Sequence, residues 1–310
     1  MSFPVFDAHC DTAYELYRTG ALLGANDCHI SLERMERIPG SAQFFAFWTA
    51  DPDAKEPPEQ LFRAMYDELI RQFSLFSGRI RLCRTADDAE AAAEEGRAAA
   101  FLSIEGAEAI SCDLEKLESA YDMGIRMITL TWNEKNPLAG SHITGEGLSD
   151  RGRAFVREAQ RLGMLVDVSH LSERAFWDIA DITDGPIVAS HSNARAVCPH
   201  SRNLTDAQFC EIVRTGGFAG LNLYAEFLGR GRVTAETVAD HALHFLRLGG
   251  AGHIVLGGDL DGCDRLPEGF DGFDSYPLLA RALLERGVDE RTVRDIFYDN
   301  LIKVVRSCSI

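Results

Sequence analysis

Several features that mark particular classes of protein are missing from this chain of 310 residues. Basic residues are in the minority, because 31 Lys and Arg against 48 Asp and Glu leave a formal charge of −17. A surface this negative repels phosphate backbones and anionic lipid head groups, so we expect neither a nucleic-acid partner nor a membrane partner. An anionic small molecule is not excluded, since one buried arginine can reverse the local field.

Long apolar runs and paired cysteines are missing as well. Nowhere do about 18 apolar residues follow one another, so we expect no membrane-spanning helix. Residues 1–7 reach Asp7 without the basic and apolar segments of an export signal. The eight cysteines are scattered and form no C-x-x-C pair, which predicts reduced thiols. Together these features predict a cytoplasmic protein.

A glycine-rich phosphate loop is the third missing feature. Neither G-x-G-x-x-G nor G-x-x-x-x-G-K-[ST] follows the first apolar run. This absence disfavours a doubly wound, nucleotide-binding sheet, which is the alternative fold for a chain of alternating strands and helices. The composition, 46% hydrophobic and 25% charged, is that of a globular protein with a sizeable core.

What the sequence does contain is a regular alternation of short apolar runs and helical patterns. Eight runs rich in β-branched and aromatic residues are expected to be strands: 4–8, 42–48, 99–104, 125–131, 164–168, 186–190, 217–223 and 253–257. Helices are expected between and after them, at 59–76, 114–123, 150–162, 172–182, 205–214, 234–248 and 276–286, with a last one capped by Asp289. Eight strand–helix units predict an α/β fold, a single (β/α)₈ TIM barrel spanning residues 1–310.

Functional residues of such a barrel lie at the carboxyl ends of its strands. Five of the eight expected strands end in metal-competent side chains: His9 and Asp11, Glu105, His170, His191, and Asp259 with Asp261. Each of these alone is more often an ordinary strand end, but together they converge on one mouth. Imidazole and carboxylate without thiolate suit Zn²⁺, and a bridging carboxylate holds two ions about 3.5–4 Å apart. The pattern therefore predicts a site for Zn²⁺ or a similar divalent ion at the mouth of the barrel.

Six segments of the chain resemble the membrane (renal-type) dipeptidases, a dizinc branch of the amidohydrolase superfamily. They are residues 7–11, 103–106, 165–170, 190–192, 201–204 and 257–262, in the same order over nearly the whole chain. The resemblance implies two Zn²⁺ ions per chain, one held by His9, Asp11 and Glu105 and the other by Glu105, His170 and His191. It also implies a homodimer.

The same resemblance assigns roles in the hydrolysis of a small dipeptide substrate. Glu105 and a hydroxide both bridge the two ions. The hydroxide attacks the peptide carbonyl, and Asp259 transfers the proton. Arg202 binds the free carboxylate, and Tyr224 lies in the substrate pocket. Two alternatives stay open: another dinuclear amidohydrolase acting on a lactone, cyclic amide or phosphoester, and a catalytically silent barrel that serves as a binding module. Tolerance of a D-residue at the C-terminal position is also left open.

The chain departs from the family pattern after the fourth strand. These dipeptidases commonly place there a histidine that contacts the scissile carbonyl, whereas this chain has Trp132. An indole N–H can donate a hydrogen bond but cannot carry positive charge. Stabilisation of the oxyanion then falls to a zinc ion alone, or to Asn133 or His142 in the following loop, and both are predicted to bind substrate. His241 and His244, in a predicted helix, are expected to be packing or surface residues.

Overall fold

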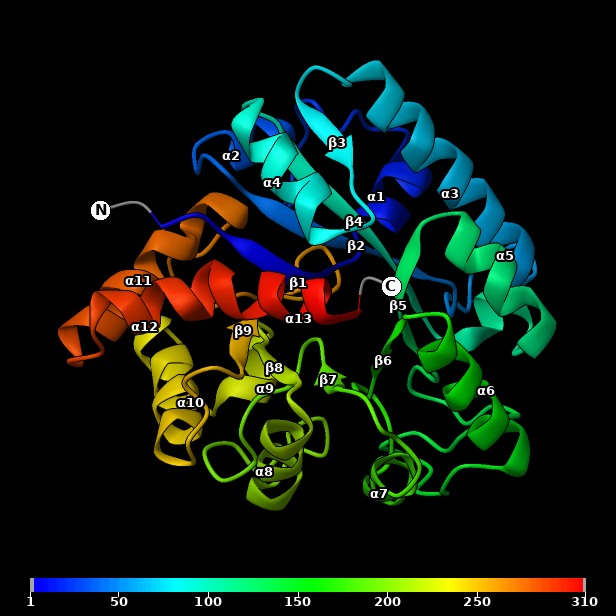
Figure 1. The fold of residues 1–310 in the computed structure, drawn as a ribbon. Helices are drawn as coiled ribbons and strands as arrows, with labels where there is room; N and C mark the ends of the chain where they lie inside the picture. Colours follow the sequence, from blue (N-terminus) through cyan, green and yellow to red (C-terminus); the bar gives the residue numbers. More distant parts are fainter. Residues whose placement is uncertain (1–2, 309–310) are drawn as a thin grey trace.

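Eight parallel strands close a barrel in the computed structural model, which describes residues 3–308 (Figure 1). In ring order they are β1 (Phe6–Cys10), β2 (Ala42–Trp48), β4 (Ala98–Glu105), β5 (Ile125–Thr129), β6 (Leu165–Asp167), β7 (Ile187–Ala189), β8 (Phe218–Leu221) and β9 (Ile254–Leu256). β1 pairs with both β2 and β9, and β2 pairs with β4, so the ring is closed. The predicted TIM barrel is confirmed; residues 1–2 and 309–310 of the predicted domain lie outside the described residues.

One strand, β3 (Ile80–Leu82), was not expected from the sequence. It pairs with β4 from Ala98 to Ala100, below Leu102, where the pairing of β4 with β5 begins. β3 therefore covers a part of the β4 edge that would otherwise leave backbone groups unpaired. Three residues are too short a run to show the alternation by which strands are recognised.

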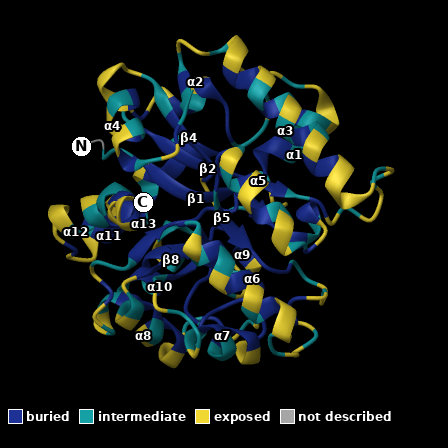
Figure 2. Ribbon diagram, turned by 45° about the vertical axis from the view of Figure 1, so that its right-hand side comes forward, coloured by how far each residue is buried: buried dark blue, intermediate teal, exposed yellow. Residues whose placement is uncertain are grey.

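The helices surround the ring and turn their exposed faces outward (Figure 2). None of the helices within residues 3–308 is long and apolar enough to span a membrane. They are α1 (Thr12–Thr19), α2 (Leu32–Met35), α3 (Pro58–Leu75), α4 (Ala86–Glu94), α5 (Leu117–Asp122), α6 (Asp150–Arg161), α7 (Glu173–Ala180), α8 (Asp206–Thr215), α9 (Ala225–Leu228), α10 (Ala235–Arg247), α11 (Tyr276–Glu285), α12 (Glu290–Arg294) and α13 (Asn300–Cys308), with short turns η1 (Ala107–Ile110), η2 (Leu114–Lys116) and η3 (Phe273–Ser275).

The predicted last helix is not continuous in the structure. Its cap is as expected, because the Asp289 side chain accepts a hydrogen bond from the backbone N–H of Thr292. The helix is then interrupted by a π-helical stretch, η4 (Asp295–Asp299), which separates α12 from α13. A π turn inserts one residue into the helical repeat, and apolar spacing alone does not reveal it.

The amino end of the barrel is filled and covered. Inside it the rings of Phe6, Phe44 and Phe101 stack with centroids 5.1–5.7 Å apart. Leu301 and Val305 of α13 belong to the same buried cluster, and α13 lies across this end of the ring in Figure 1. A site of this fold is therefore to be sought at the opposite, carboxyl end.

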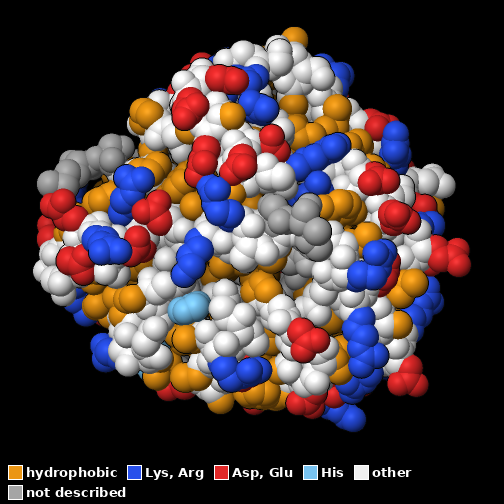
Figure 3. Space-filling view, in the orientation of Figure 1, with side chains coloured by type: hydrophobic (Ala, Val, Ile, Leu, Met, Phe, Trp, Pro, Cys, Tyr) orange, Lys and Arg blue, Asp and Glu red, His pale blue; other side chains and the backbone are white. Residues whose placement is uncertain are grey.

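Charges of both signs lie side by side on the face that carries α13 (Figure 3). Arg306 of α13, for example, pairs with Asp87 at 2.9 Å and also with Glu90. Exposed pairs of this kind contribute roughly 0–1 kcal/mol each. The apolar side of α13 therefore contributes more to holding the helix in place than its ion pairs do.

Candidate metal centre

Two candidate ligands come from the end of β1. Between Asp7 and Cys10 the pairing of β1 with β2 shifts by one residue, the signature of a β-bulge. A bulge re-aims side chains, so His9 faces the mouth although Ala8 packs in the barrel interior. Asp11 follows as the residue before α1, and its side chain makes no capping hydrogen bond. Both side chains are therefore available to a ligand at the mouth.

Within residues 3–308, three groups of three side chains could hold a metal ion, and two of them, which overlap, contain the five predicted ligands. The third joins His9 and His191 with Asp259. His9 Nε2 lies 3.4 Å from Asp11 Oδ2 and 3.6 Å from Glu105 Oε2. The other oxygen of Glu105, Oε1, lies 2.9 Å from His170 Nε2 and 3.5 Å from His191 Nε2. Ligand atoms around one tetrahedral zinc ion are about 3.4 Å apart. We call the five predicted ligands the metal side; Glu105 offers one oxygen to each of the two overlapping groups.

The two carboxylates of the metal side favour a positive charge between them. Burial opposes a proton on His9, but Glu105 and Asp11 raise its pKa well above the usual value. Burial and Glu105 raise the pKa of Asp11. Burial lowers the pKa of His170 and of His191, so both rings are neutral. A proton on His9 thus supplies positive charge that a metal ion would otherwise supply.

Unsatisfied atoms give a test of whether a metal fits. Within residues 3–308, His9 Nε2 and Asp11 Oδ1 are buried without any hydrogen-bond partner. Leaving such a group unpaired costs about 1–3 kcal/mol, which a bound cation would offset. Imidazole nitrogens and carboxylate oxygens are the donors that zinc accepts. The residues present therefore fit two divalent ions that share Glu105.

A buried aspartate that the sequence analysis missed orients His191. Asp167 accepts hydrogen bonds from the backbone N–H groups of Ser169 and Ser190, both at 2.9 Å, and from the Ser190 hydroxyl. Ser190 Oγ in turn lies 2.7 Å from His191 Nδ1. Because the Ser190 proton points to Asp167, His191 Nδ1 must donate, which leaves Nε2 free as a ligand.

Asp7 is a second buried aspartate that the sequence analysis missed, and it supports the loop after β9. Its side chain accepts hydrogen bonds from the backbone N–H of Gly258, at 2.9 Å, and from the hydroxyl of Tyr276. Asp7 and Asp167 could have been noticed in the sequence, because each is a charged residue inside an otherwise apolar strand.

The two aspartates after β9 have different surroundings. Both oxygens of Asp261 are engaged, by the backbone N–H of His29 at 2.6 Å and by Thr12 Oγ1 at 2.7 Å. Asp259 Oδ2 accepts from Asn222 at 2.9 Å, while Oδ1 faces the metal side, 3.9 Å from His9 Nε2. Asp259 thus has an oxygen available to a reacting group, whereas both oxygens of Asp261 are used within the protein. The catalytic role of Asp259 stays a prediction.

The backbone at the site is strained. His170, Asp259 and Asp261 all have left-handed conformations, with φ of 69°, 57° and 67°. Such conformations cost energy in residues other than glycine and cluster at functional sites. Gly262 comes next, and a Cβ there would collide with the carboxylates of Asp11 and Asp259. Only glycine allows the loop to approach the metal side so closely.

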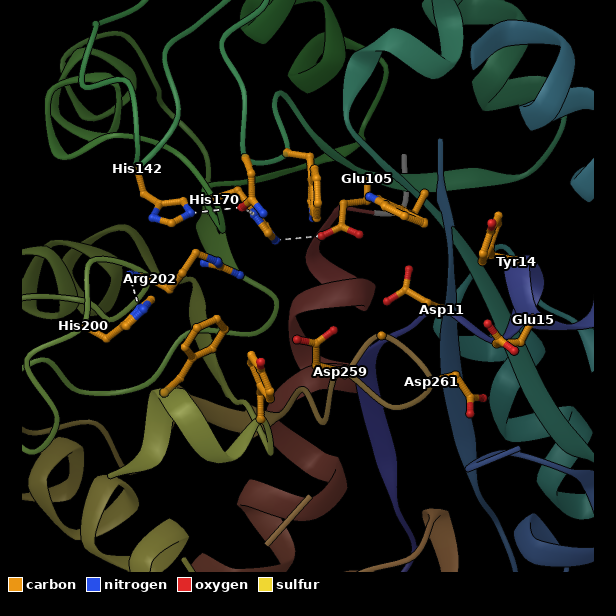
Figure 4. A pocket seen from close by; sticks show the side chains of 16 residues that line it. Asp11, Tyr14, Glu15, Glu105, His142, His170, His200, Arg202, Asp259 and Asp261 are labelled. Atoms are coloured by element: carbon orange, nitrogen blue, oxygen red, sulfur yellow. Dashed lines mark hydrogen bonds and ion pairs between the residues drawn. The ribbon is translucent and has the colours of Figure 1, made fainter. Parts of the chain in front are cut away.

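A pocket of about 400 Å³ separates the metal side from Arg202 (Figure 4). Arg202 is 4% exposed and lies over the ring of Phe227, 5.5 Å from its centroid. Among the described residues, neither Nε nor Nη2 of Arg202 has a hydrogen-bond partner. The third nitrogen, Nη1, donates to Ser192 Oγ at 3.5 Å. A buried guanidinium with two free donors indicates the binding site of an anion, for which its planar fork is suited. The volume is that of a small-molecule site.

Other predicted residues line the same pocket. Tyr224, Asn133 and His142 all do so, as does Trp132. Burial and Asp264 raise the pKa of Tyr224 to about 12, so its hydroxyl is a donor. We call His200, Arg202, Tyr224 and Phe227 the arginine side.

Sequence reasoning missed several lining residues. Trp48 packs edge-on against Trp132 with centroids 5.2 Å apart. Trp48 is the last residue of a predicted strand, so it could have been found by examining the carboxyl ends of the strands. The rings of His200 and Phe227 lie with their centroids 4.5 Å apart, but both residues lie outside the strands and no sequence pattern marked them. His241 uses both ring nitrogens on the backbone, at Ala194 N and Leu228 O, as a packing residue does.

Comparison with known proteins extends the resemblance over the whole chain. A family model described as membrane dipeptidase (peptidase family M19) matches residues 1–309. An uncharacterized dipeptidase of Schizosaccharomyces pombe is 37% identical over an alignment of 281 residues, and the match covers 83% of this chain and 67% of the relative. A Rhodobacter sphaeroides metallo peptidase, liganded with a phosphinate mimic of the dipeptide L-Ala-D-Ala, is 32% identical with a TM-score of 0.91 over 98% of this chain and 99% of its own. Dipeptidase AC, of family M19, is 33% identical with a TM-score of 0.90, covering 98% of each chain.

Proposed function

The chain belongs to the membrane dipeptidase family, peptidase family M19, and from that premise we propose that it is a zinc-dependent hydrolase of free dipeptides. The observation that carries the proposal is the placement, across one small pocket, of the metal side opposite the buried Arg202, whose Nε and Nη2 have no partner among the described residues. A free dipeptide has a scissile carbonyl and a terminal carboxylate a few atoms apart. It therefore supplies one group for each side of the pocket.

Recognition of the substrate falls to the arginine side. The carboxylate of a dipeptide would accept charge-assisted hydrogen bonds from Arg202, whose free donors have no other partner among the described residues. We extend the proposal to dipeptides with a C-terminal D-residue. Its support is that the Rhodobacter sphaeroides relative is liganded with a mimic of L-Ala-D-Ala and superposes closely.

The metal side would hold the two ions. His9, Asp11 and Glu105 would bind one, and Glu105, His170 and His191 the other. When bound, two divalent ions polarise a carbonyl and lower the pKa of a water molecule. The chain contributes rigid placement, since His191 is oriented by Ser190 and Asp167.

Proton transfer falls to Asp259. Its Oδ1 would take a proton from the attacking water as the new C–O bond forms. It would return that proton to the leaving nitrogen as the peptide C–N bond breaks, so the products are two free amino acids. The hydrogen bond from Asn222 to Oδ2 keeps Oδ1 turned toward the reacting atoms.

The test combines elemental analysis with a substrate screen. We expect two zinc ions per chain, and cleavage of L,L- and L,D-dipeptides but not of their C-terminal amides. Matched lactones and phosphotriesters serve as controls for the rival hydrolase. Cleavage of these esters without cleavage of any dipeptide, or absence of bound metal after reconstitution with zinc, would contradict the proposal.

A further inference from the structure

The side chain of Asn133, which lies in the loop after β5, connects the two sides of the pocket. Its amide oxygen, Oδ1, lies 3.0 Å from His170 Nδ1 and also 3.0 Å from His142 Nε2. An amide oxygen only accepts hydrogen bonds, so both ring nitrogens must carry protons in this arrangement. A proton on Nδ1 of His170 leaves the lone pair of Nε2 for a metal.

The orientation of the amide follows from the proposed function, on which this step rests. If the amide nitrogen faced His170, Nδ1 would have to accept and Nε2 would carry the proton. His170 could then not bind a metal through Nε2, the atom that lies 2.9 Å from Glu105. Metal binding therefore selects the arrangement in which Asn133 Oδ1 accepts from both rings.

His142 extends the connection to the loop that carries Arg202. Its second nitrogen, Nδ1, lies 2.8 Å from the hydroxyl of Ser201, the residue before Arg202. With Nε2 donating to Asn133, Nδ1 accepts from this hydroxyl. The backbone N–H of His142 also donates to the carbonyl of His170 at 2.7 Å. Both ring nitrogens of His142 are thus used within the protein, and neither is left for a substrate.

We infer that Asn133 and His142 are positioning residues for the two sides of the pocket. Asn133 holds the ring of His170 in the form that binds metal. His142 ties Asn133 to Ser201 and so fixes the distance from the metal side to Arg202. A dipeptide has to reach both sides at once, so this distance sets the length of substrate that fits.

Four substitutions separate the two links. Asn133→Leu removes the acceptor from both rings, whereas Asn133→Asp keeps an oxygen acceptor in the same place. His142→Phe leaves the bond between Asn133 and His170 and removes the link to Ser201, which Ser201→Ala also removes with a smaller change in shape. Zinc affinity is measured by competition with a chromogenic chelator. Binding of a phosphinate mimic of L-Ala-D-Ala to the zinc-loaded protein is measured separately.

We expect Asn133→Leu to weaken one of the two zinc ions about 10- to 100-fold, and Asn133→Asp to restore wild-type zinc affinity. His142→Phe and Ser201→Ala should keep wild-type zinc affinity but bind the mimic about tenfold more weakly. Wild-type zinc affinity in Asn133→Leu would overturn the inference, as would a zinc defect in His142→Phe equal to that of Asn133→Leu. If the leucine variant does not fold, Asn133→Ala replaces it.

The two proposals fail in different ways. The zinc titrations require no turnover, so they decide the role of Asn133 even if the zinc-loaded protein cleaves no dipeptide. That second result would instead contradict the proposed function.

Discussion

The metal side and the arginine side of the pocket are opposite in charge and in construction (Figure 4). On the metal side, His9 lies within 4 Å of two carboxylates and Glu105 within 4 Å of three imidazoles, and two buried ligand atoms are left unpaired in the described residues. The arginine side has a buried cation with two unpaired donors. The metal side lacks cations, which two metal ions would supply, and the arginine side lacks an anion, so a ligand without a negatively charged group would leave Arg202 unsatisfied.

The two sides also differ in what holds them. Glu105 ends β4, and His9 lies in β1, so strand pairing fixes the metal side. Arg202 instead lies in the loop between β7 and α8. Its neighbour Asn203 fastens this loop by donating to the carbonyls of Cys198 at 2.9 Å and Phe227 at 2.7 Å. Substitutions on the metal side should therefore abolish chemistry, whereas those on the arginine side should change which ligand is bound.

The largest effect is expected for Glu105→Gln. A neutral amide bridges two cations poorly, so both zinc ions should bind more weakly and kcat should fall about 10⁴-fold or more. Elemental analysis and steady-state kinetics measure the two effects. Glu108→Gln, three residues along, is the control and should keep both ions. Loss of one ion with the other at wild-type affinity would argue against the bridge.

Asp259→Asn should have the next largest effect, because it removes the proton carrier and leaves the metal ligands. We expect kcat to fall roughly 10²–10⁴-fold with both ions retained. Asp261→Asn is the matched comparison. It disturbs the hydrogen bonds from His29 and Thr12, so it should lower the melting temperature and leave kcat close to the wild-type value. The reverse result, a crippled Asp261→Asn and a normal Asp259→Asn, would exchange the two roles.

Arg202→Met tests the arginine side alone. It should lower kcat/KM for a dipeptide about 10²-fold and narrow the difference between the dipeptide and its C-terminal amide, since the group that distinguishes them is gone. Arg214→Met, at an exposed position of α8 paired with Glu211, is the control. Equal wild-type rates on dipeptide and amide would show that Arg202 does not bind the carboxylate.

The contrast between the two sides also explains what could be predicted from the sequence. The barrel and the metal side follow from strand ends, because parallel strands bring their carboxyl ends to one mouth whatever lies between them. His9, Glu105 and His191 were accessible in this way.

The remainder depends on contacts that have no periodicity. Phe227 reaches Arg202 and His200 from α9, which is only four residues long. The links from Asn133 to His170 and from His142 to Ser201 join loops after different strands. Asn133 and His142 could be proposed as pocket residues from their place in the chain, but their partners could not.

The smallest effect, on the pH dependence of stability, is expected for His241. This buried ring joins the loop that carries Arg202 to α9, which carries Phe227. Its Nδ1 accepts from the backbone N–H of Ala194 at 3.1 Å, and its Nε2 donates to the carbonyl of Leu228 at 2.9 Å. Burial lowers its pKa below the usual 6.5. The folded protein therefore keeps the ring neutral at a pH where the unfolded chain takes up a proton.

The sign of the pH dependence at His241 follows from this difference. The stability due to the neutral ring is fully present above pH 6.5 and falls as the pH drops, by up to about 1.4 kcal/mol per pH unit, until the folded pKa is reached. His241→Gln removes this titration while keeping a donor and an acceptor. We therefore expect the loss in free energy of unfolding between pH 7.5 and pH 5.5 to be about 1 kcal/mol smaller in the variant than in the wild type. Urea unfolding with a chelator present measures it without interference from metal binding, and the other histidines cancel in the comparison. An unchanged pH dependence would mean that the folded protein does not resist protonation of the His241 ring.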